Sequence, residues 1–97
     1  MSEAARNLVR AHAWVSGRVQ GVAYRVFARQ AAVHWKLTGG VRNLADGRVE
    51  VVVEGARGDV DAFFGRLKQG PPTAFVKDIQ IQWKPTTGQD IDFVIWY

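Results

Sequence analysis

The chain has 97 residues, of which 47% are hydrophobic and 23% are charged, as in an ordinary globular protein. Its 13 basic and 9 acidic residues give a net charge of +4, which favours anionic ligands without specifying them. The sequence has no cysteine, which excludes disulfides and thiol catalysis, and no apolar run approaches the roughly 20 residues that span a bilayer. We predict a cytoplasmic protein without membrane contact, with residues 1–8 as a mobile N-terminal extension and residues 9–97 as one domain.

Hydrophobic periodicity predicts the first half of the chain as strand, helix and hairpin. Apolar residues alternate along residues 9–16, which indicates a half-buried strand. From Tyr24 they recur at helical spacing, and this helix is expected to end near Lys36. Residues 37–44 and 49–53 have strand character, and the Asp46-Gly47 pair between them is typical of a tight hairpin turn.

The second half of the chain repeats this pattern. Asp59 is expected to cap a second helix, which Gly70 and the prolines after it end. Residues 79–83 and 93–97 then alternate as strands. The order is βαββαβ with a final strand, which predicts an α+β, ferredoxin-like sandwich: an antiparallel sheet with two helices on one face and a C-terminal fifth strand.

This topology brings distant segments together at one end of the sheet. The first two strands run in the same direction, so the loop after residue 17 and residues 42–44 should be neighbours. With strand order 4-1-3-2-5, the final strand must cross about 19 Å at ~4.8 Å per strand. Residues 84–90 reach about 24 Å when extended, so the crossing is feasible.

Residues 17–25, with the sequence GRVQGVAYR, join the first strand to the first helix and suggest an anion-binding loop. The glycines allow positive φ and leave amides uncovered, and the helix start directs free N–H groups and its positive dipole end into the same hollow. Arg25 can add a fork of donors matched to phosphate oxygens. The spacing of a nucleotide-binding P-loop is missing, and glycine-bounded connectors are common, so this motif needs support from elsewhere in the chain.

Further motifs supply that support. The GRVQGVAYR loop, VRN at residues 41–43, DGRVE at residues 46–50 and GPP at residues 70–72 together resemble the acylphosphatase family across residues 9–97. The resemblance implies a small ferredoxin-like enzyme that hydrolyses acyl phosphates to a carboxylate and inorganic phosphate, with no metal and no cofactor. Its implied partners are a small-molecule acyl phosphate as substrate and inorganic phosphate as product and inhibitor, and we expect a monomer.

The resemblance also implies roles for individual residues. The arginine that matches Arg25 binds the phosphoryl group, and the asparagine that matches Asn43 positions the attacking water. The remaining phosphate-binding residues, which act mainly through their backbone amides, are expected to be Arg18, Val19, Gln20, Gly21 and Val22. Three departures are Gly40, where the family usually has an aromatic residue, residues 35–37 with the sequence WKL, where it usually has Gly-Leu, and Tyr24, where it usually has phenylalanine. The change at Gly40 is expected to loosen the wall beside Asn43.

Other functions compete with this interpretation. The serines and histidines form no recognisable Ser-His-Asp arrangement, and His12 and His34 are expected to be exposed. An RNA-binding module has the same βαββαβ order and uses aromatics on its open sheet face, where Trp14 is expected to lie. Strand residues 48–54 lack the aromatic spacing of such modules and carry Glu50 and Glu54, so nucleic acid is an unlikely partner. A regulatory anion-binding domain without turnover is the third possibility.

Overall fold

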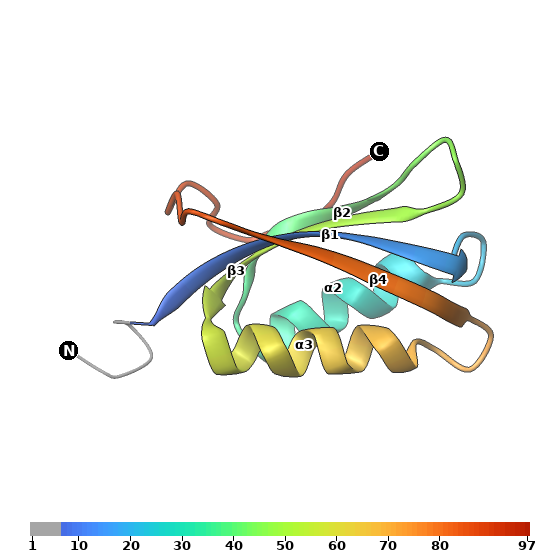
Figure 1. The fold of residues 1–97 in the computed structure, drawn as a ribbon, viewed down its shortest axis with the longest axis horizontal. Helices are drawn as coiled ribbons and strands as arrows, with labels where there is room; N and C mark the ends of the chain where they lie inside the picture. The colour runs from blue at the N-terminus through green and yellow to red at the C-terminus, as the bar shows by residue number, and fades with distance from the viewer. Residues whose placement is uncertain (1–6) are drawn as a thin grey trace.

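A five-stranded sheet forms the centre of the computed structural model, which describes residues 7–97, and two helices cover one of its faces (Figure 1). The elements in chain order are β1 (Leu8–Arg18), α2 (Tyr24–His34), β2 (Thr38–Asn43), β3 (Val49–Ala56), α3 (Arg57–Gln69), β4 (Phe75–Lys84) and β5 (Phe93–Ile95). The strand order is β4-β1-β3-β2-β5, as predicted. Only the β2–β5 pair is parallel among these strands. The ferredoxin-like α+β architecture is confirmed.

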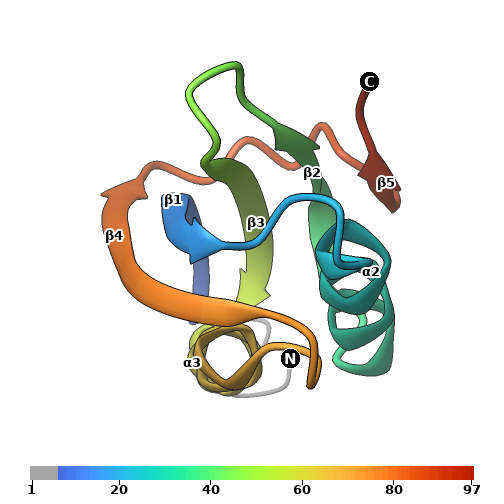
Figure 2. The same cartoon turned by 90° about the vertical axis from the view of Figure 1, so that its right-hand side faces the viewer.

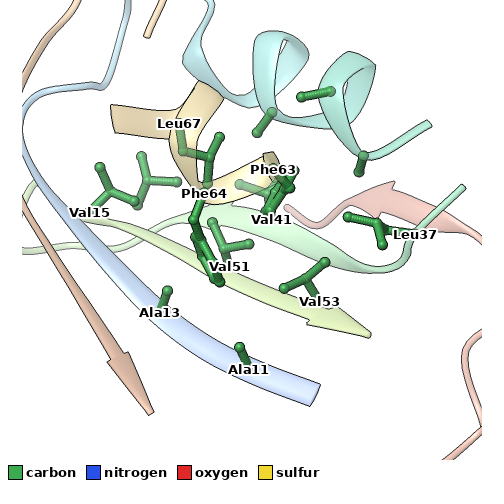
Figure 3. Close-up of a cluster of buried hydrophobic side chains, with 14 of the residues drawn as sticks. Ala11, Ala13, Val15, Leu37, Val41, Val51, Val53, Phe63, Phe64 and Leu67 are labelled. Atoms are coloured by element: carbon green, nitrogen blue, oxygen red, sulfur yellow. The ribbon is translucent and has the colours of Figure 1, made fainter. Parts of the chain in front are cut away.

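The core lies between the sheet and the helices (Figure 3). Every second side chain of the two central strands points toward the helices, because side chains alternate between the faces of a strand. α3 packs against these side chains with the apolar stripe that its sequence predicts. None of these side chains is more than 4% exposed: Ala11, Ala13, Val15, Val49, Val51, Val53, Val60, Phe63, Phe64 and Leu67. Burying each larger one contributes roughly 1.5–3 kcal/mol, so this layer holds the helices on the sheet.

Several element ends differ from those predicted from the sequence. α3 begins at Arg57, and its N-cap is Ala56 rather than Asp59. The reason is that β3 runs directly into the helix, where the Arg57 amide donates to the Asn7 carbonyl at 3.0 Å. Asp59 instead lies in the first turn, where its negative charge interacts favourably with the positive end of the helix dipole. α2 ends at His34, two residues before Lys36, which has a φ of 56°.

The first residues of β4 and β1 also differ from those predicted. β4 begins at Phe75, four residues earlier than predicted, because it pairs with the far end of β1. Leu8 is the first residue of β1 and pairs with Ala56, although we assigned it to the N-terminal extension. The rest of that predicted extension, residues 1–6, lies outside the described residues. No helix within residues 7–97 is long and apolar enough to cross a membrane.

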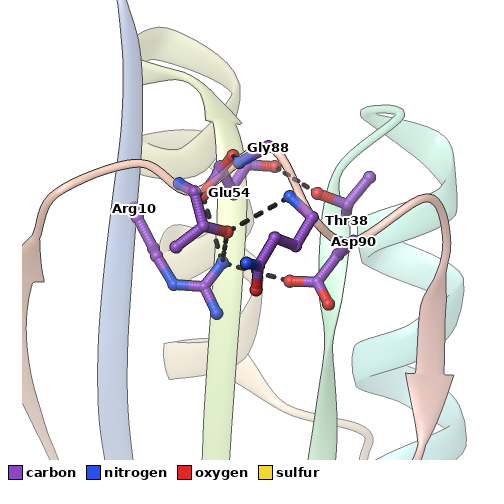
Figure 4. Close-up of polar contacts among 7 residues, drawn as sticks. Arg10, Thr38, Glu54, Gly88 and Asp90 are labelled. Carbon is purple, nitrogen blue, oxygen red and sulfur yellow. Dashed lines mark hydrogen bonds and ion pairs between the residues drawn. The ribbon is translucent and has the colours of Figure 1, made fainter.

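Polar pairs occupy the sheet face that the helices leave open. The Glu54 carboxylate accepts hydrogen bonds from Arg10 and from the amides of Thr87 and Gly88, in the segment that joins β4 to β5 (Figure 4). On the same face, Nε2 of His12 lies 2.9 Å from Oε2 of Glu50. The His12 ring also stacks on the Trp14 ring, with their centroids 4.2 Å apart. Because of these two contacts, His12 is half-buried and paired rather than exposed as predicted. His34 is exposed, as predicted.

Candidate active site

The loop from β1 to α2 lies at the end of the sheet where β2 also ends, and Figure 2 looks onto this end. β1 and β2 each run antiparallel to β3, so they point in the same direction. β5 pairs with β2 in parallel and ends here as well. The topology therefore gathers the end of β1, the start of α2, the β2–β3 hairpin and the residues after β5 at one place, as the sequence predicts.

A β-bulge turns the chain from β1 into the loop. The register with β4 shifts between Ser16 and Gly17, and Gly17 has a φ of 122°. A Cβ atom at Gly17 would lie 2.2 Å from the Phe75 carbonyl oxygen, so only glycine fits this close approach of two strands. Gly17 thus shapes the bulge inside β1, whereas Gly21, with a φ of 73° and open space around it, lies in the loop itself.

The start of α2 presents uncompensated positive charge to the loop. Its N-cap, Ala23, has left-handed dihedrals with a φ of 61°, makes no side-chain capping bond, and is followed by no acidic residue in the first turn. The main-chain amides of Val19, Gln20, Gly21 and Val22 donate to no carbonyl within residues 7–97. A run of free amides at a helix N-terminus with its dipole end uncapped attracts anions.

The start of α2 and two of these loop residues, Val19 and Gly21, border a hollow of about 120 Å³. A cavity needs about 10–15 Å³ for one water molecule, so the hollow has room for a tetrahedral oxyanion together with a water. Four of the predicted site residues line it: Val19, Gly21, Arg25 and Asn43. The other lining residues come from the N-cap and first turn of α2, from β5 and from the segment after β5: Ala23, Tyr24, Val26, Ile95 and Tyr97.

Arg25 and Asn43 enter the hollow from different elements. Arg25 is the second residue of α2 and makes no ion pair with a carboxylate among the described residues. Asn43 is the last residue of β2, and its side-chain oxygen Oδ1 is buried without a hydrogen-bond partner in the described part of the chain. Buried acceptors are nearly always satisfied, so Oδ1 is suited to a donor that enters from the hollow, such as a water.

Tyr97 also lines the hollow. A final strand parallel to the second predicts that the Tyr97 carboxylate lies at the same end of the sheet as Arg25, but that reasoning did not foresee the contact of its ring. Its ring lies over the Arg25 guanidinium, with the Cζ atom 5.2 Å from the ring centroid. Such a contact attracts a cation to the ring face and limits the movement of the arginine. The available signal was the parallel pairing of β5 with β2, which brings the segment after β5 to the same end of the sheet.

The remaining predicted phosphate-binding residues do not line the hollow. Arg18 is exposed and is the last residue of β1, paired with Phe75. The Gln20 side chain turns away toward the β2–β3 hairpin, where Nε2 donates to the carbonyls of Leu44 and Arg48. Val22 has its carbonyl bonded to the Thr73 hydroxyl at 3.2 Å. These residues could contribute main-chain amides, but their side chains have other surroundings.

The expected loosening at Gly40 does not occur. A Cβ atom at Gly40 would lie 2.4 Å from the Trp96 indole, so the Trp96 ring occupies the space above this glycine. Moreover, Gly40 and Asn43 are three residues apart on one strand, so their side chains leave opposite faces of the sheet. The wall beside Asn43 is consequently independent of position 40.

A larger hollow of about 410 Å³ lies between the helices and shares no lining residue with the smaller one. Its lining residues are Phe27, Gln30, Ala31, His34, Trp35 and Arg66. It offers one arginine, which packs over the Phe27 ring at 5.0 Å, and no uncapped helix start. The smaller hollow therefore has the chemistry of an anion site and the larger one does not.

Fold and hollow together define a class: small ferredoxin-like domains with an anion-suited loop ahead of the first helix. Comparisons with known proteins agree. The sequence profile of the acylphosphatase family matches residues 11–95. The chain is 43% identical to an acylphosphatase of Chloroflexus aurantiacus over 91 residues, which is 93% of this chain and 99% of the relative.

Two solved structures are also similar. A Bacillus subtilis acylphosphatase is 36% identical and superposes with a TM-score of 0.89 over 92% of this chain and 99% of that one. An acylphosphatase from Coxiella burnetii is 34% identical, with a TM-score of 0.90 over 99% of this chain and 100% of that one. The chain belongs to the acylphosphatase family. It is an enzyme that hydrolyses the carboxyl–phosphate bond of acyl phosphates, small-molecule substrates.

Proposed function

We propose that the hollow between residues 19–23 and the end of β2 is the active site, and that water attacks phosphorus there directly. The free loop amides and the Arg25 guanidinium would bind the three phosphoryl oxygens, whose charge they stabilise. Asn43 would hold the attacking water through Oδ1. The buried, unpartnered Oδ1 at the wall of this hollow is the observation that carries the proposal.

The reaction does not require the protein to form a covalent bond with the substrate. The carboxylate of an acyl phosphate is already a good leaving group, so catalysis reduces to holding the phosphoryl group in line with a water and stabilising its charge. Oxygen of water bonds to phosphorus, and the phosphorus–oxygen bond to the acyl group breaks with its electron pair on the carboxylate. Asn43 cannot accept a proton at neutral pH, so a phosphoryl oxygen takes the proton of the water. No covalent enzyme intermediate and no metal are required.

We further propose that inorganic phosphate competes with substrate as the product, and that the enzyme is a cytoplasmic monomer. The lack of cysteine in the sequence supports the location. Nucleic acid is not a proposed partner. On the open sheet face, Glu50 pairs with His12 and Arg42, and Glu54 pairs with Arg10. These basic side chains therefore already have carboxylate partners and are poorly suited to bind the phosphates of a nucleic acid.

Two substitutions test the assigned roles with benzoyl phosphate as substrate. Asn43→Ala should lower kcat by about 10²-fold while inhibition by phosphate weakens much less, because water is positioned only for attack. Arg25→Gln should reduce kcat and weaken phosphate inhibition together, because the guanidinium binds the phosphoryl group in both complexes. Equal losses of kcat and phosphate affinity in Asn43→Ala would contradict the role of Asn43.

A further inference from the structure

The Gln20 carboxamide joins the phosphate loop to the hairpin that follows Asn43. Its Nε2 donates to the Leu44 carbonyl at 2.7 Å and to the Arg48 carbonyl at 2.9 Å. A side-chain amide has two N–H groups, so both are used. Leu44 directly follows Asn43, and Arg48 directly precedes β3, so Gln20 bonds both arms of the hairpin at once.

The two carbonyls also close the hairpin itself. The Leu44 amide donates to the Arg48 carbonyl at 2.8 Å, and the Gly47 amide donates to the Leu44 carbonyl at 3.2 Å. Each oxygen therefore accepts one bond from the hairpin and one from Gln20, which uses both of its lone pairs. Gln20 is attached to the ordered base of the turn, one residue from Asn43, rather than to its tip.

One other side-chain hydrogen bond ties this loop to the rest of the described chain, and it leads elsewhere. The Thr73 hydroxyl donates to the Val22 carbonyl at 3.2 Å and comes from the segment between α3 and β4. Within residues 7–97, Gln20 alone links residues 19–23 to residues 43–48 by side-chain hydrogen bonds. The two tethers act on the same loop, but only one of them reaches the strand end that carries Asn43.

We propose that Gln20 is a positioning residue: its side chain holds the end of β2 at a fixed place relative to the amides and Arg25, and so sets Asn43 in line with the phosphoryl group. This inference rests on the proposed function. Reacting atoms must lie about 3–3.5 Å apart and in line, and a 1 Å misplacement can cost about 10²-fold in rate. Without the tether, no side-chain hydrogen bond among the described residues would hold residues 19–23 to the hairpin.

The test replaces Gln20 by a side chain of similar length without donors. Gln20→Met should lower kcat for benzoyl phosphate at least tenfold, while inhibition by inorganic phosphate changes less than threefold. The matched control is Thr73→Val, which removes the other tether of the same loop and should leave kcat within twofold. Circular dichroism establishes that each variant is folded at the assay temperature. If Gln20→Met does not fold, Gln20→Asn serves instead, because the shorter side chain cannot reach both carbonyls.

A double-mutant cycle separates positioning from a structural role. If Gln20 acts through Asn43, Gln20→Met should lower kcat no further in an Asn43→Ala background, because the group that it positions is gone. Independent, multiplying losses would overturn the inference, as would a kcat for Gln20→Met within twofold of wild type. A matching loss of phosphate affinity would also overturn it, since Gln20 would then act on the loop alone. Failure of the proposed function is distinct: Asn43→Ala by itself would leave kcat unchanged.

Discussion

Tyr24, the first residue of α2, uses its hydroxyl to bind the end of the other helix. The side chain is buried, and the hydroxyl donates to the Leu67 carbonyl at 2.7 Å. Leu67 lies in the last turn of α3, whose carbonyls lack partners inside the helix. The hydroxyl by which Tyr24 differs from the usual phenylalanine of the family therefore satisfies a buried acceptor.

We expect Tyr24→Phe to lower the free energy of unfolding by about 1–3 kcal/mol, because the Leu67 carbonyl is left buried without a donor. Urea denaturation at pH 7 measures this loss. Burial also raises the pKa of Tyr24 above its ordinary value of 10.0. The folded state thus prefers the neutral phenol, and the stability linked to it is present below pH 10 and is lost as pH rises beyond that.

The advantage of wild type over Tyr24→Phe should therefore shrink as the pH is raised above 10. A difference between the two proteins that stays constant from pH 7 to pH 11, or no difference at pH 7, would contradict this account of the hydroxyl.

At the scale of elements, the junction between β1 and the loop that leads to α2 depends on two glycines with different demands. Gly17 has a φ of 122° and lies against the β4 backbone, whereas Gly21 has a φ of 73° and nothing within 4 Å of its missing Cβ. The backbone conformation disfavours other residues at both positions, but only Gly17 adds a steric clash with main-chain atoms that cannot move aside.

Gly17→Ala should accordingly destabilise the protein far more than Gly21→Ala. For Gly21→Ala we expect about 1–2 kcal/mol, the cost of a left-handed alanine. For Gly17→Ala we expect more than about 3 kcal/mol, because β1 and β4 must separate at the bulge. Thermal unfolding of the two variants side by side gives the comparison, and similar melting temperatures would show that the bulge tolerates a side chain.

At the scale of the whole molecule, Glu54 ties together three segments that are distant in the chain. It belongs to β3 and binds Arg10 of β1 at 3.1 Å, and it accepts the amides of Thr87 at 3.0 Å and Gly88 at 2.9 Å. Those amides lie in the connection that carries the chain from one edge of the sheet to the other. Asp90, in the same connection, also binds Arg10 at 3.0 Å.

Because of this cluster, the free energy of unfolding should depend on pH in the acidic range. Burial by itself would raise the pKa of Glu54, but the bonds from Thr87, Gly88 and Arg10 outweigh it and lower the pKa below its ordinary 4.5. The stability that the carboxylate contributes is therefore present above pH 4.5 and is lost as pH falls below it. Glu50 behaves in the same direction, because the bonds from His12 and Arg42 outweigh its burial and lower its pKa.

Glu54→Gln should destabilise the protein by about 2–3 kcal/mol at pH 7. The substitution removes hydrogen bonds to a charged acceptor, and the NH₂ group of the new side chain cannot accept from the donors that now bind the carboxylate. Denaturant unfolding from pH 7 to pH 3 should show the gap between wild type and variant closing as Glu54 becomes protonated. A gap that does not change with pH would mean that the carboxylate charge has no part in holding the crossover.

The sequence by itself determined the local structure and the family. Alternating and helical spacings predict each strand and helix within a few residues, because they reflect which side of an element is buried. The paired motifs around Arg25 and Asn43 predict the enzyme class, and the length of the last connection shows only that the strand order of this fold is feasible. Errors occurred at element ends, such as Asp59, where the neighbouring strand rather than the local sequence decides where the helix begins.

Only the tertiary structure decided which distant side chains meet. The bonds of Gln20 to the hairpin, the Tyr97 ring over Arg25, the Trp96 ring above Gly40 and the amides on Glu54 join residues more than 20 positions apart. Such contacts depend on strand register and on the path of a loop across the sheet. A periodicity records only which face of an element is buried, and it contains no information about the partner.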